Sequence, residues 1–156
     1  MQGDARLTLG NAPDQSYDLI FVDAFIGAAI PTHLLTKEAI SLYLRKLKSH
    51  GVVAIHVSNY YLELASVVAG SAGANGLITR EYDGGDIQED ANQQKWVPRV
   101  VAAARGDEDF GVLATSNFWP ILRPNPYQRV WTDDYTNVAG ALRRRLSEQR
   151  HELSAK

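Results

Sequence analysis

Short apolar runs recur along the first two thirds of the chain and indicate buried strands. Residues 17–22 read Tyr-Asp-Leu-Ile-Phe-Val, an uninterrupted rather than alternating pattern, which is typical of a strand buried on both faces of a parallel sheet. Residues 52–57 repeat this pattern, and residues 77–82 and 96–104 are two further predicted strands. Pro98 cannot donate to a sheet ladder, so we expect it at the start of its strand or at a sheet edge.

The segment between the first two strands carries the signals of a helix. Thr36 is a predicted N-cap with an acidic residue in the first turn, and apolar residues follow at helical spacing as far as Leu47. Lys48 and His50 crowd the predicted C-terminus, and Gly51 fits the position just past it.

Two more helices are predicted further along the chain. Ser58 or Asn59 is the predicted cap of a helix over residues 62–69. The last helix carries an apolar stripe from Val138 to Leu146.

Strands that alternate with helices predict an α/β domain with a doubly wound, mainly parallel sheet. We expect a single domain over residues 1–156, with an irregular, proline-rich segment at residues 107–130. In such sheets ligands bind beyond the carboxyl ends of the strands. Asp23 directly follows the first strand, where a carboxylate can act as a general base or hold a cation. The alternative is that Asp23 only caps a turn or the next helix.

Composition narrows the classes of partner. The chain has 16 Lys and Arg against 18 Asp and Glu, so no general attraction to nucleic acid or anionic lipid is expected. The absence of cysteine excludes disulfides and thiolate metal sites, and it fits a reducing, cytoplasmic compartment. The N-terminus lacks the apolar stretch of a signal peptide, and residues 19–30 fall short of the roughly 20 residues that cross a bilayer. We therefore expect no membrane insertion by this chain.

The last helix contains a basic run, Arg143, Arg144 and Arg145, that allows contact with nucleic acid. A solvated helix face balanced by Glu148 and Glu152 explains the same run and agrees better with the overall charge. No nucleic-acid partner is therefore expected.

The remaining candidate side chains allow more than one interpretation. The four histidines show no tight metal-ligand spacing, so we expect no metal site. Trp96, Trp119 and Trp131 are predicted to pack in the core or a lid, because no basic groove accompanies them. Asp133 and Asp134 are either acids that face a polyamine or caps of the last helix, and capping is slightly favoured.

Five runs of sequence, in order and spacing, resemble the aminopropyltransferase family, spermidine synthase and its relatives. The resemblance is greatest to the bacterial branch in which such a domain is often fused behind a transporter-like membrane region. The runs are residues 3–6 (GDAR), 17–25 (YDLIFVDAF), 30–36 (IPTHLLT), 51–59 (GVVAIHVSN) and 131–135 (WTDDY).

This resemblance implies a methyltransferase-like Rossmann sheet with the strand order 3-2-1-4-5-7-6, of which the chain would hold strands four to seven. The family moves an aminopropyl group from decarboxylated S-adenosylmethionine to a diamine. By the resemblance, Asp4 and Ala5 match the motif at the adenine end of this co-substrate. Asp23 matches the acid that orients and deprotonates the attacking amine. A substrate-binding role for the segment with Asp133, Asp134 and Tyr135 is the weakest of these assignments.

The chain also departs from the family pattern. Ile26 stands where spermidine synthases carry a second acid, and the glycine-rich turn and ribose-binding acid would lie before Gly3. We therefore expect an incomplete cofactor site and little or no activity from this chain alone. Two other functions stay open: a noncatalytic structural or interaction module derived from the fold, and a methyltransferase that uses S-adenosylmethionine itself.

Strand order also predicts self-association. The strand at residues 17–22 would present an unpaired apolar edge, with no Lys or Pro to discourage pairing. We expect a two-fold homodimer joined at or near this edge, because closed pairing satisfies both edges. The alternative is that residues 3–9 or the C-terminal helix cover the edge within one chain.

Overall fold

The computed structural model describes residues 4–23, 31–59, 61–84 and 98–154. Its elements, in chain order, are α1 (Ala5–Gly10), β1 (Tyr17–Val22), the 3-10 helix η1 (Thr32–Leu34), α2 (Lys37–Lys46), β2 (Leu47–His56), α3 (Ala65–Gly73), β3 (Ile78–Tyr82), β4 (Val100–Ala104), the 3-10 helix η2 (Asp107–Thr115) and α4 (Val138–Ser154).

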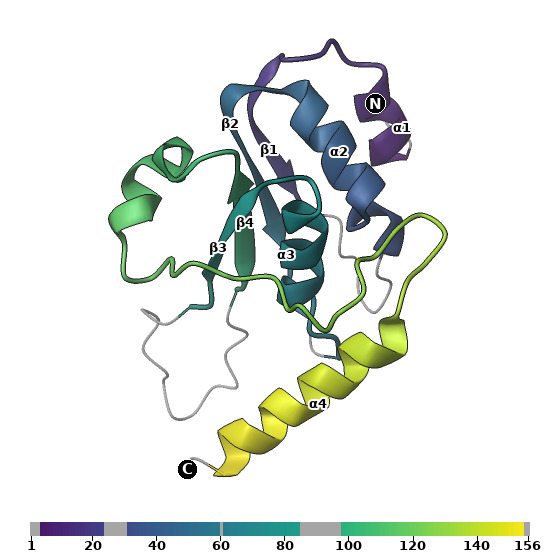
Figure 1. Cartoon of the computed structure of the whole chain (residues 1–156), viewed down its shortest axis with the longest axis vertical. Coiled ribbons are helices and arrows are strands. Elements are labelled where there is room, and N and C mark those ends of the chain that lie inside the picture. The colour runs from purple at the N-terminus through teal and green to yellow at the C-terminus, as the bar shows by residue number, and fades with distance from the viewer. Residues whose placement is uncertain (1–3, 24–30, 60, 85–97, 155–156) are drawn as a thin grey trace.

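The four strands form one sheet in the order β1-β2-β4-β3. β1 and β2 are parallel, whereas β4 runs antiparallel to both of its neighbours. β1, β2 and β3 therefore share one direction, and β4 opposes them (Figure 1). This confirms the order predicted for strands four to seven, and Pro98 lies just before β4, as expected.

Each face of the sheet packs against different elements (Figure 1). On the first face, side chains such as Val53 and Ile55 are completely buried with Val68 of α3 and Ile40 of α2. On the second face, Phe110 of η2 packs with Ala102 and Ala104 of β4. The ring of Trp119 also stacks on Tyr82 of β3, with 5.6 Å between the centroids. Apolar burial on two faces is what makes a sheet of this class stable.

The prediction that β1 is buried on both faces is wrong. Ile20 is 9% exposed on the core face, but Leu19 and Phe21, on the other face, are 58% and 56% exposed. The reason is that η2 packs against β2 and β4 on that face. The strand keeps an exposed apolar face, and within the described ranges only β2 pairs with it.

The predicted C-terminus of the helix between β1 and β2 is also wrong. α2 ends at Lys46, and β2 begins at once, so Lys48, His50 and Gly51 lie in the strand. The Lys46 ammonium donates to the carbonyl of Ala12, at 2.6 Å, and so ties this junction to the segment before β1. Long-range bonds thus override the local helical pattern.

Gly51 occupies a crowded place in β2, and it provides a test of this register. A Cβ there would lie 2.9 Å from a Leu47 methyl and 3.1 Å from the Tyr17 carbonyl oxygen. We expect Gly51→Ala to lower the free energy of unfolding by about 1–3 kcal/mol, since the clash involves backbone. Gly70→Ala, inside α3 with open space around it, is the matched control and should raise it by about 0.5–1 kcal/mol. Equal effects in urea unfolding would contradict the packing at Gly51.

The caps differ from those predicted. Neither Ser58 nor Asn59 caps α3, which begins at Ala65. Its first turn is bonded instead by Glu63, whose carboxylate accepts from the Ser66 N–H at 2.8 Å. Asn59 accepts from the two N–H groups of residues 61 and 62 and closes a turn before the helix.

At the C-terminal side, the Asn137 side chain accepts from the Gly140 N–H at 2.8 Å and caps α4. The prediction that Asp133 or Asp134 caps this helix is therefore wrong. The segment predicted to be irregular, residues 107–130, opens with η2, which kinks at Gly111 because φ there is +54°. The positive φ suits glycine, which has no Cβ to clash.

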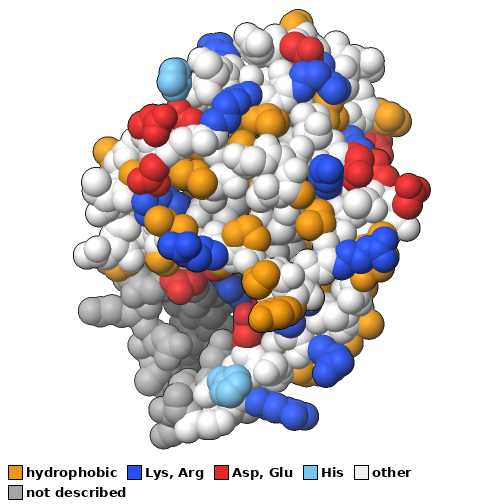
Figure 2. All heavy atoms as spheres, in the orientation of Figure 1, with side chains coloured by type: hydrophobic (Ala, Val, Ile, Leu, Met, Phe, Trp, Pro, Cys, Tyr) orange, Lys and Arg blue, Asp and Glu red, His pale blue; other side chains and the backbone are white. Residues whose placement is uncertain are grey.

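The basic run of α4 is largely paired. Arg144 donates to Glu63 at 2.9 Å, and Arg145 pairs with Glu148 at 3.0 Å. Figure 2 shows cationic and anionic side chains interspersed over the face it displays. Within the described ranges no helix is long and apolar enough to cross a membrane.

Candidate functional site

Three polar side chains meet where the carboxyl ends of β1 and β2 reach the same edge of the sheet. Asp23 follows β1, His56 is the last residue of β2, and Ser58 lies two residues further. β4 runs the opposite way, so its first residue, Val100, pairs with His56, and Arg99 just before it reaches the same edge. Ligands of doubly wound sheets bind beyond this edge.

The three side chains form a hydrogen-bonded row. Asp23 Oδ1 lies 2.8 Å from His56 Nδ1, and His56 Nε2 lies 2.6 Å from Ser58 Oγ. Ser58 Oγ also accepts from the backbone N–H of Arg99, at 2.6 Å. The row therefore connects β1, β2 and β4.

Exposure along the row falls from Asp23 inward. The Asp23 side chain is 52% exposed, that of His56 is 13% exposed, and Ser58 is 4% exposed. The carboxylate is thus the end of the row that an incoming molecule can reach. A half-exposed carboxylate whose first oxygen is held can bind an ammonium or accept its proton through the second oxygen.

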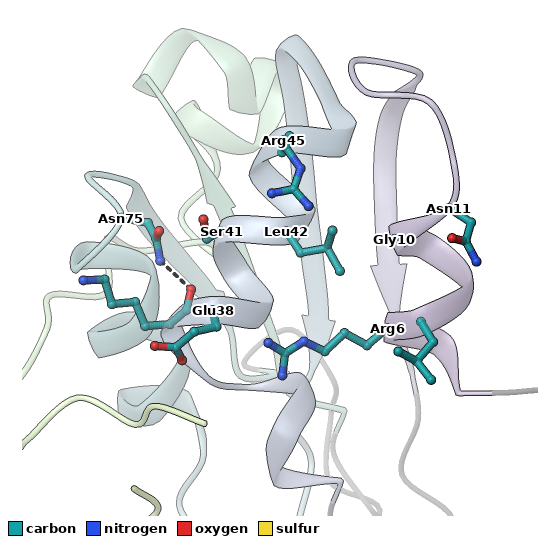
Figure 3. Close-up of a pocket in the computed structure, with 10 residues that line it drawn as sticks. Arg6, Gly10, Asn11, Glu38, Ser41, Leu42, Arg45 and Asn75 are labelled. Atoms are coloured by element: carbon teal, nitrogen blue, oxygen red, sulfur yellow. Dashed lines mark hydrogen bonds between the residues drawn. The ribbon is translucent and has the colours of Figure 1, made fainter. Parts of the chain in front are cut away.

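Asp4 caps α1, and Ala5 is the first residue of that helix. The Asp4 carboxylate accepts from the N–H groups of Arg6, at 2.8 Å, and Leu7, at 3.1 Å. The bond from Leu7 is the main cause that lowers the pKa of Asp4. In Figure 3 the first turn of α1, marked by Arg6, lies at the end toward which β1 points. Asp4 is thus on the same side of the domain as Asp23.

Asp133 links α1 to the segment before α2. Its two carboxylate oxygens lie 2.7 and 2.6 Å from the Arg6 guanidinium, and one also accepts from the Thr36 hydroxyl at 2.7 Å. Asp134 is exposed, and the Tyr135 ring lies under the Arg129 guanidinium at 3.9 Å. A substrate-binding role for Asp133, Asp134 and Tyr135 stays a prediction.

The Arg6–Asp133 pair predicts a component of acid sensitivity. The bond from Arg6 is the main cause that lowers the pKa of Asp133. Because the folded pKa lies below the unfolded one, the stabilisation is present above the unfolded pKa and is lost as pH falls through the folded pKa. The side chain is 42% exposed, so we expect a loss of only about 0.5–1 kcal/mol.

Unfolding of Asp133→Asn, measured from pH 6 to below pH 3, should therefore show a smaller acid-induced loss than the wild type. Asp134→Asn, the neighbouring acid, is the control and should keep the wild-type pH dependence. If the two variants lose stability in parallel with the wild type, the Arg6 pair contributes nothing.

A groove of about 680 Å³ lies between α1 and α2 (Figure 3). Its charged lining consists of Arg6, Lys37 and Arg45, with Glu38 as the acid. Neither Asp23 nor His56 lines it. The groove lies in the helical layer and is separate from the row at the sheet edge.

No family model and no curated protein matches the sequence. Among solved structures, the chain is similar to spermidine synthase from Thermotoga maritima, with 16% identity over 90% of this chain and 44% of that one, at a TM-score of 0.50. It is also similar to MnmC2 from Aquifex aeolicus, with 18% identity over 81% of this chain and 39% of that one, at a TM-score of 0.44.

These findings define the class of fold. The chain has a partial Rossmann-like sheet of the methyltransferase type. It spans less than half the length of either solved structure. At 16% identity, the similarity to the spermidine synthase structure shows the fold and no activity.

Sequence reasoning missed two members of the row. It assigned His56 to the end of a strand and Ser58 to a helix cap, although both follow a buried apolar run, as Asp23 does. The same signal that selected Asp23 could have selected them. Ile26, the main departure from the family pattern, lies outside the described residues.

Proposed function

We propose that this chain carries the amine-facing side of a group-transfer site like that of spermidine synthase. The reaction would move an aminopropyl group from decarboxylated S-adenosylmethionine to a diamine or another small polyamine. One observation carries the proposal: the Asp23 carboxylate stands at the carboxyl edge of the sheet, half exposed, with one oxygen fixed by His56. An ammonium substrate needs such a group, both to hold it and to remove a proton.

The chemistry requires little more than positioning and proton removal. The ammonium gives a proton to the open oxygen of Asp23, and the freed nitrogen lone pair attacks the carbon bonded to the sulfonium. The new N–C bond forms as the C–S bond breaks, and the electron pair of that bond stays on sulfur. The leaving group is a neutral thioether, so no second acid is needed to protonate it. The product is a secondary ammonium, which keeps its proton near neutral pH, and the proton on Asp23 passes to solvent to restore the carboxylate.

The other residues would serve the two ends of the site. Asp4 and Ala5, at the start of α1, would lie at the adenine end of the co-substrate, and Asp134 and Tyr135 would contact the far part of the polyamine. Asp4 caps α1 through Oδ1, so Oδ2, which lies 3.6 Å from His33 Nε2, is the oxygen that would make such a contact. Since the chain spans less than half of the solved spermidine synthase, we expect weak nucleoside binding and low turnover.

Product analysis tests the proposal and separates it from the alternatives. The chain is incubated with a diamine and either decarboxylated S-adenosylmethionine or S-adenosylmethionine, and the products are identified by mass spectrometry. Methylthioadenosine together with an aminopropylated amine supports the proposal. Adenosylhomocysteine together with a methylated product would replace it with methyl transfer. If neither donor gives a product and the chain binds no diamine, the result would support the third interpretation, a noncatalytic structural module.

We also propose that two copies pair through β1. Among the described residues β1 is hydrogen-bonded to β2 alone, and α1 packs on α2. Leu19 and Phe21 stand beside the open edge and are more than half exposed. A two-fold axis normal to the sheet keeps the same face of both copies on one side, and an axis that passes at Ile20 would set Leu19 opposite Phe21 of the second copy.

Light scattering at micromolar concentration should therefore give the mass of a dimer. Leu19→Lys places a charge in the pairing surface and should give a monomer. Tyr127→Lys is the matched control, because Tyr127 is 97% exposed and belongs to a loop outside the sheet, and this variant should remain dimeric. A monomeric wild type in which amides 17–22 exchange slowly would show that the edge is covered within one chain.

A further inference from the structure

The row at the sheet edge fixes which proton the His56 ring carries. Ser58 Oγ accepts the Arg99 backbone N–H at 2.6 Å, so its own hydrogen is available to donate. The nearer acceptor for that hydrogen is His56 Nε2 at 2.6 Å, since the Arg99 carbonyl oxygen lies at 3.5 Å. With Nε2 as acceptor, the neutral ring carries its hydrogen on Nδ1 and donates it to Asp23.

Asp, His and Ser also form the catalytic triad of serine hydrolases, but the burial and hydrogen bonds of Ser58 do not suit a nucleophile. Ser58 is 4% exposed, and its oxygen is bonded to the Arg99 N–H. Attack by this oxygen would break that bond and leave a buried N–H without a partner. The end of the row that faces outward is Asp23, and the hydroxyl serves as its buried anchor.

We propose that His56 is the positioning residue of Asp23, with Ser58 holding the ring in the required tautomer. This rests on the proposed function. The Nδ1 hydrogen holds Oδ1 of the carboxylate, at 2.8 Å, so that the other oxygen stays aimed at the amine. Without this bond a half-exposed side chain at a strand end turns freely between rotamers, and the carboxylate is seldom in place.

The anchor also accommodates a second proton on the ring. When Nε2 gains a hydrogen, it donates to Ser58 Oγ, and the hydroxyl turns to the Arg99 carbonyl oxygen, 3.5 Å away. No buried polar group loses its partner in this exchange. The proton taken from the amine stays on the open oxygen of Asp23, because the ring nitrogen that carries no hydrogen, Nε2, faces the buried Ser58.

The first test needs no catalysis. Long-range ¹H–¹⁵N spectra of the chain at neutral pH should show His56 as the Nδ1–H tautomer. Ser58→Ala should remove the donor to Nε2 and shift the ring towards a mixture of tautomers. A wild-type ring with its hydrogen on Nε2 would overturn the inference, whether or not the chain transfers amines.

The second test replaces His56 by an amide that can or cannot reach Asp23 as Nδ1 does. The side-chain nitrogen of Asn lies three bonds from Cα, as Nδ1 of His does. The side-chain nitrogen of Gln lies four bonds from Cα, as Nε2 does. We expect His56→Asn to keep kcat within a few fold of wild type, and His56→Gln to lower it by about 10- to 100-fold, the effect of losing one hydrogen bond to a charged group. Both should leave KM for the sulfonium donor unchanged, since His56 holds the acid on the amine side.

Equal losses in the two variants, with equal melting temperatures, would overturn the positioning role. If the wild type shows neither transfer nor diamine binding, the proposed function fails, and the tautomer and its response to Ser58→Ala still decide the positioning of Asp23.

Discussion

Replacing Asp23 by Asn should reduce amine transfer by about 10²- to 10⁴-fold, the contribution typical of a positioned general base. The amide keeps the size of the side chain and can still meet the His56 ring. It removes the charge that holds an ammonium and the oxygen that accepts its proton. The loss should appear chiefly in kcat, because proton removal belongs to the reaction step.

Asp18→Asn is the matched control for this prediction. Asp18 lies in β1, five residues before Asp23, which is about 17 Å along an extended chain. Its carboxylate pairs with the Lys48 ammonium at 2.7 Å. The variant loses the same charge at the opposite end of β1 and should retain wild-type turnover. If both variants lose equal activity, the effect comes from net charge or folding and Asp23 has no special role.

Replacing Trp131 by Ala should lower the free energy of unfolding by about 3–5 kcal/mol, the cost of a large cavity in a packed core. Trp131 is 1% exposed and belongs to the main hydrophobic cluster. Its backbone carbonyl accepts from the first N–H of α2, at Lys37, with a distance of 2.9 Å. The loss is a large part of the 5–15 kcal/mol that stabilises a typical domain, and urea unfolding measures it.

Trp131→Phe should lose much less than the alanine variant, about 1–2 kcal/mol. The ring fills most of the space, and the indole N–H, which is buried and has no partner in the described part of the chain, is removed. Tyr127→Ala, at a position 97% exposed, should change nothing. An alanine variant at position 131 as stable as the wild type would show that the 131–135 segment does not close the core.

The strand pattern could be predicted because strong local signals and packing agreed. The run at residues 17–22 became β1 with the same bounds, and the order of all four strands agrees with the one that the family resemblance implied. The junction after α2 could not be predicted from local signals. Lys48 and His50 suit a helix terminus, but the chain there is bonded to the segment before β1, which is distant in sequence.

Exposure and partners were harder to predict than elements. The exposure of Leu19 and Phe21 depends on which elements cover that face of the sheet. The sequence pattern within β1 does not show which elements these are. His56 and Asp23 are 33 positions apart, and only the parallel pairing of β1 with β2 brings their side chains together. The sequence was enough to place Asp23 at the carboxyl edge of the sheet. The structure was needed to show that the His56 imidazole holds its carboxylate.

The most direct measurement is a titration of the ¹⁵N-labelled chain with a diamine, followed by amide and imidazole chemical shifts. We expect saturable shifts centred on Asp23, His56 and Ser58, and we expect them to vanish in Asp23→Asn but persist in Asp18→Asn. A diamine that leaves these signals unmoved, or that shifts only the groove between α1 and α2, would contradict an amine site at the carboxyl edge of the sheet.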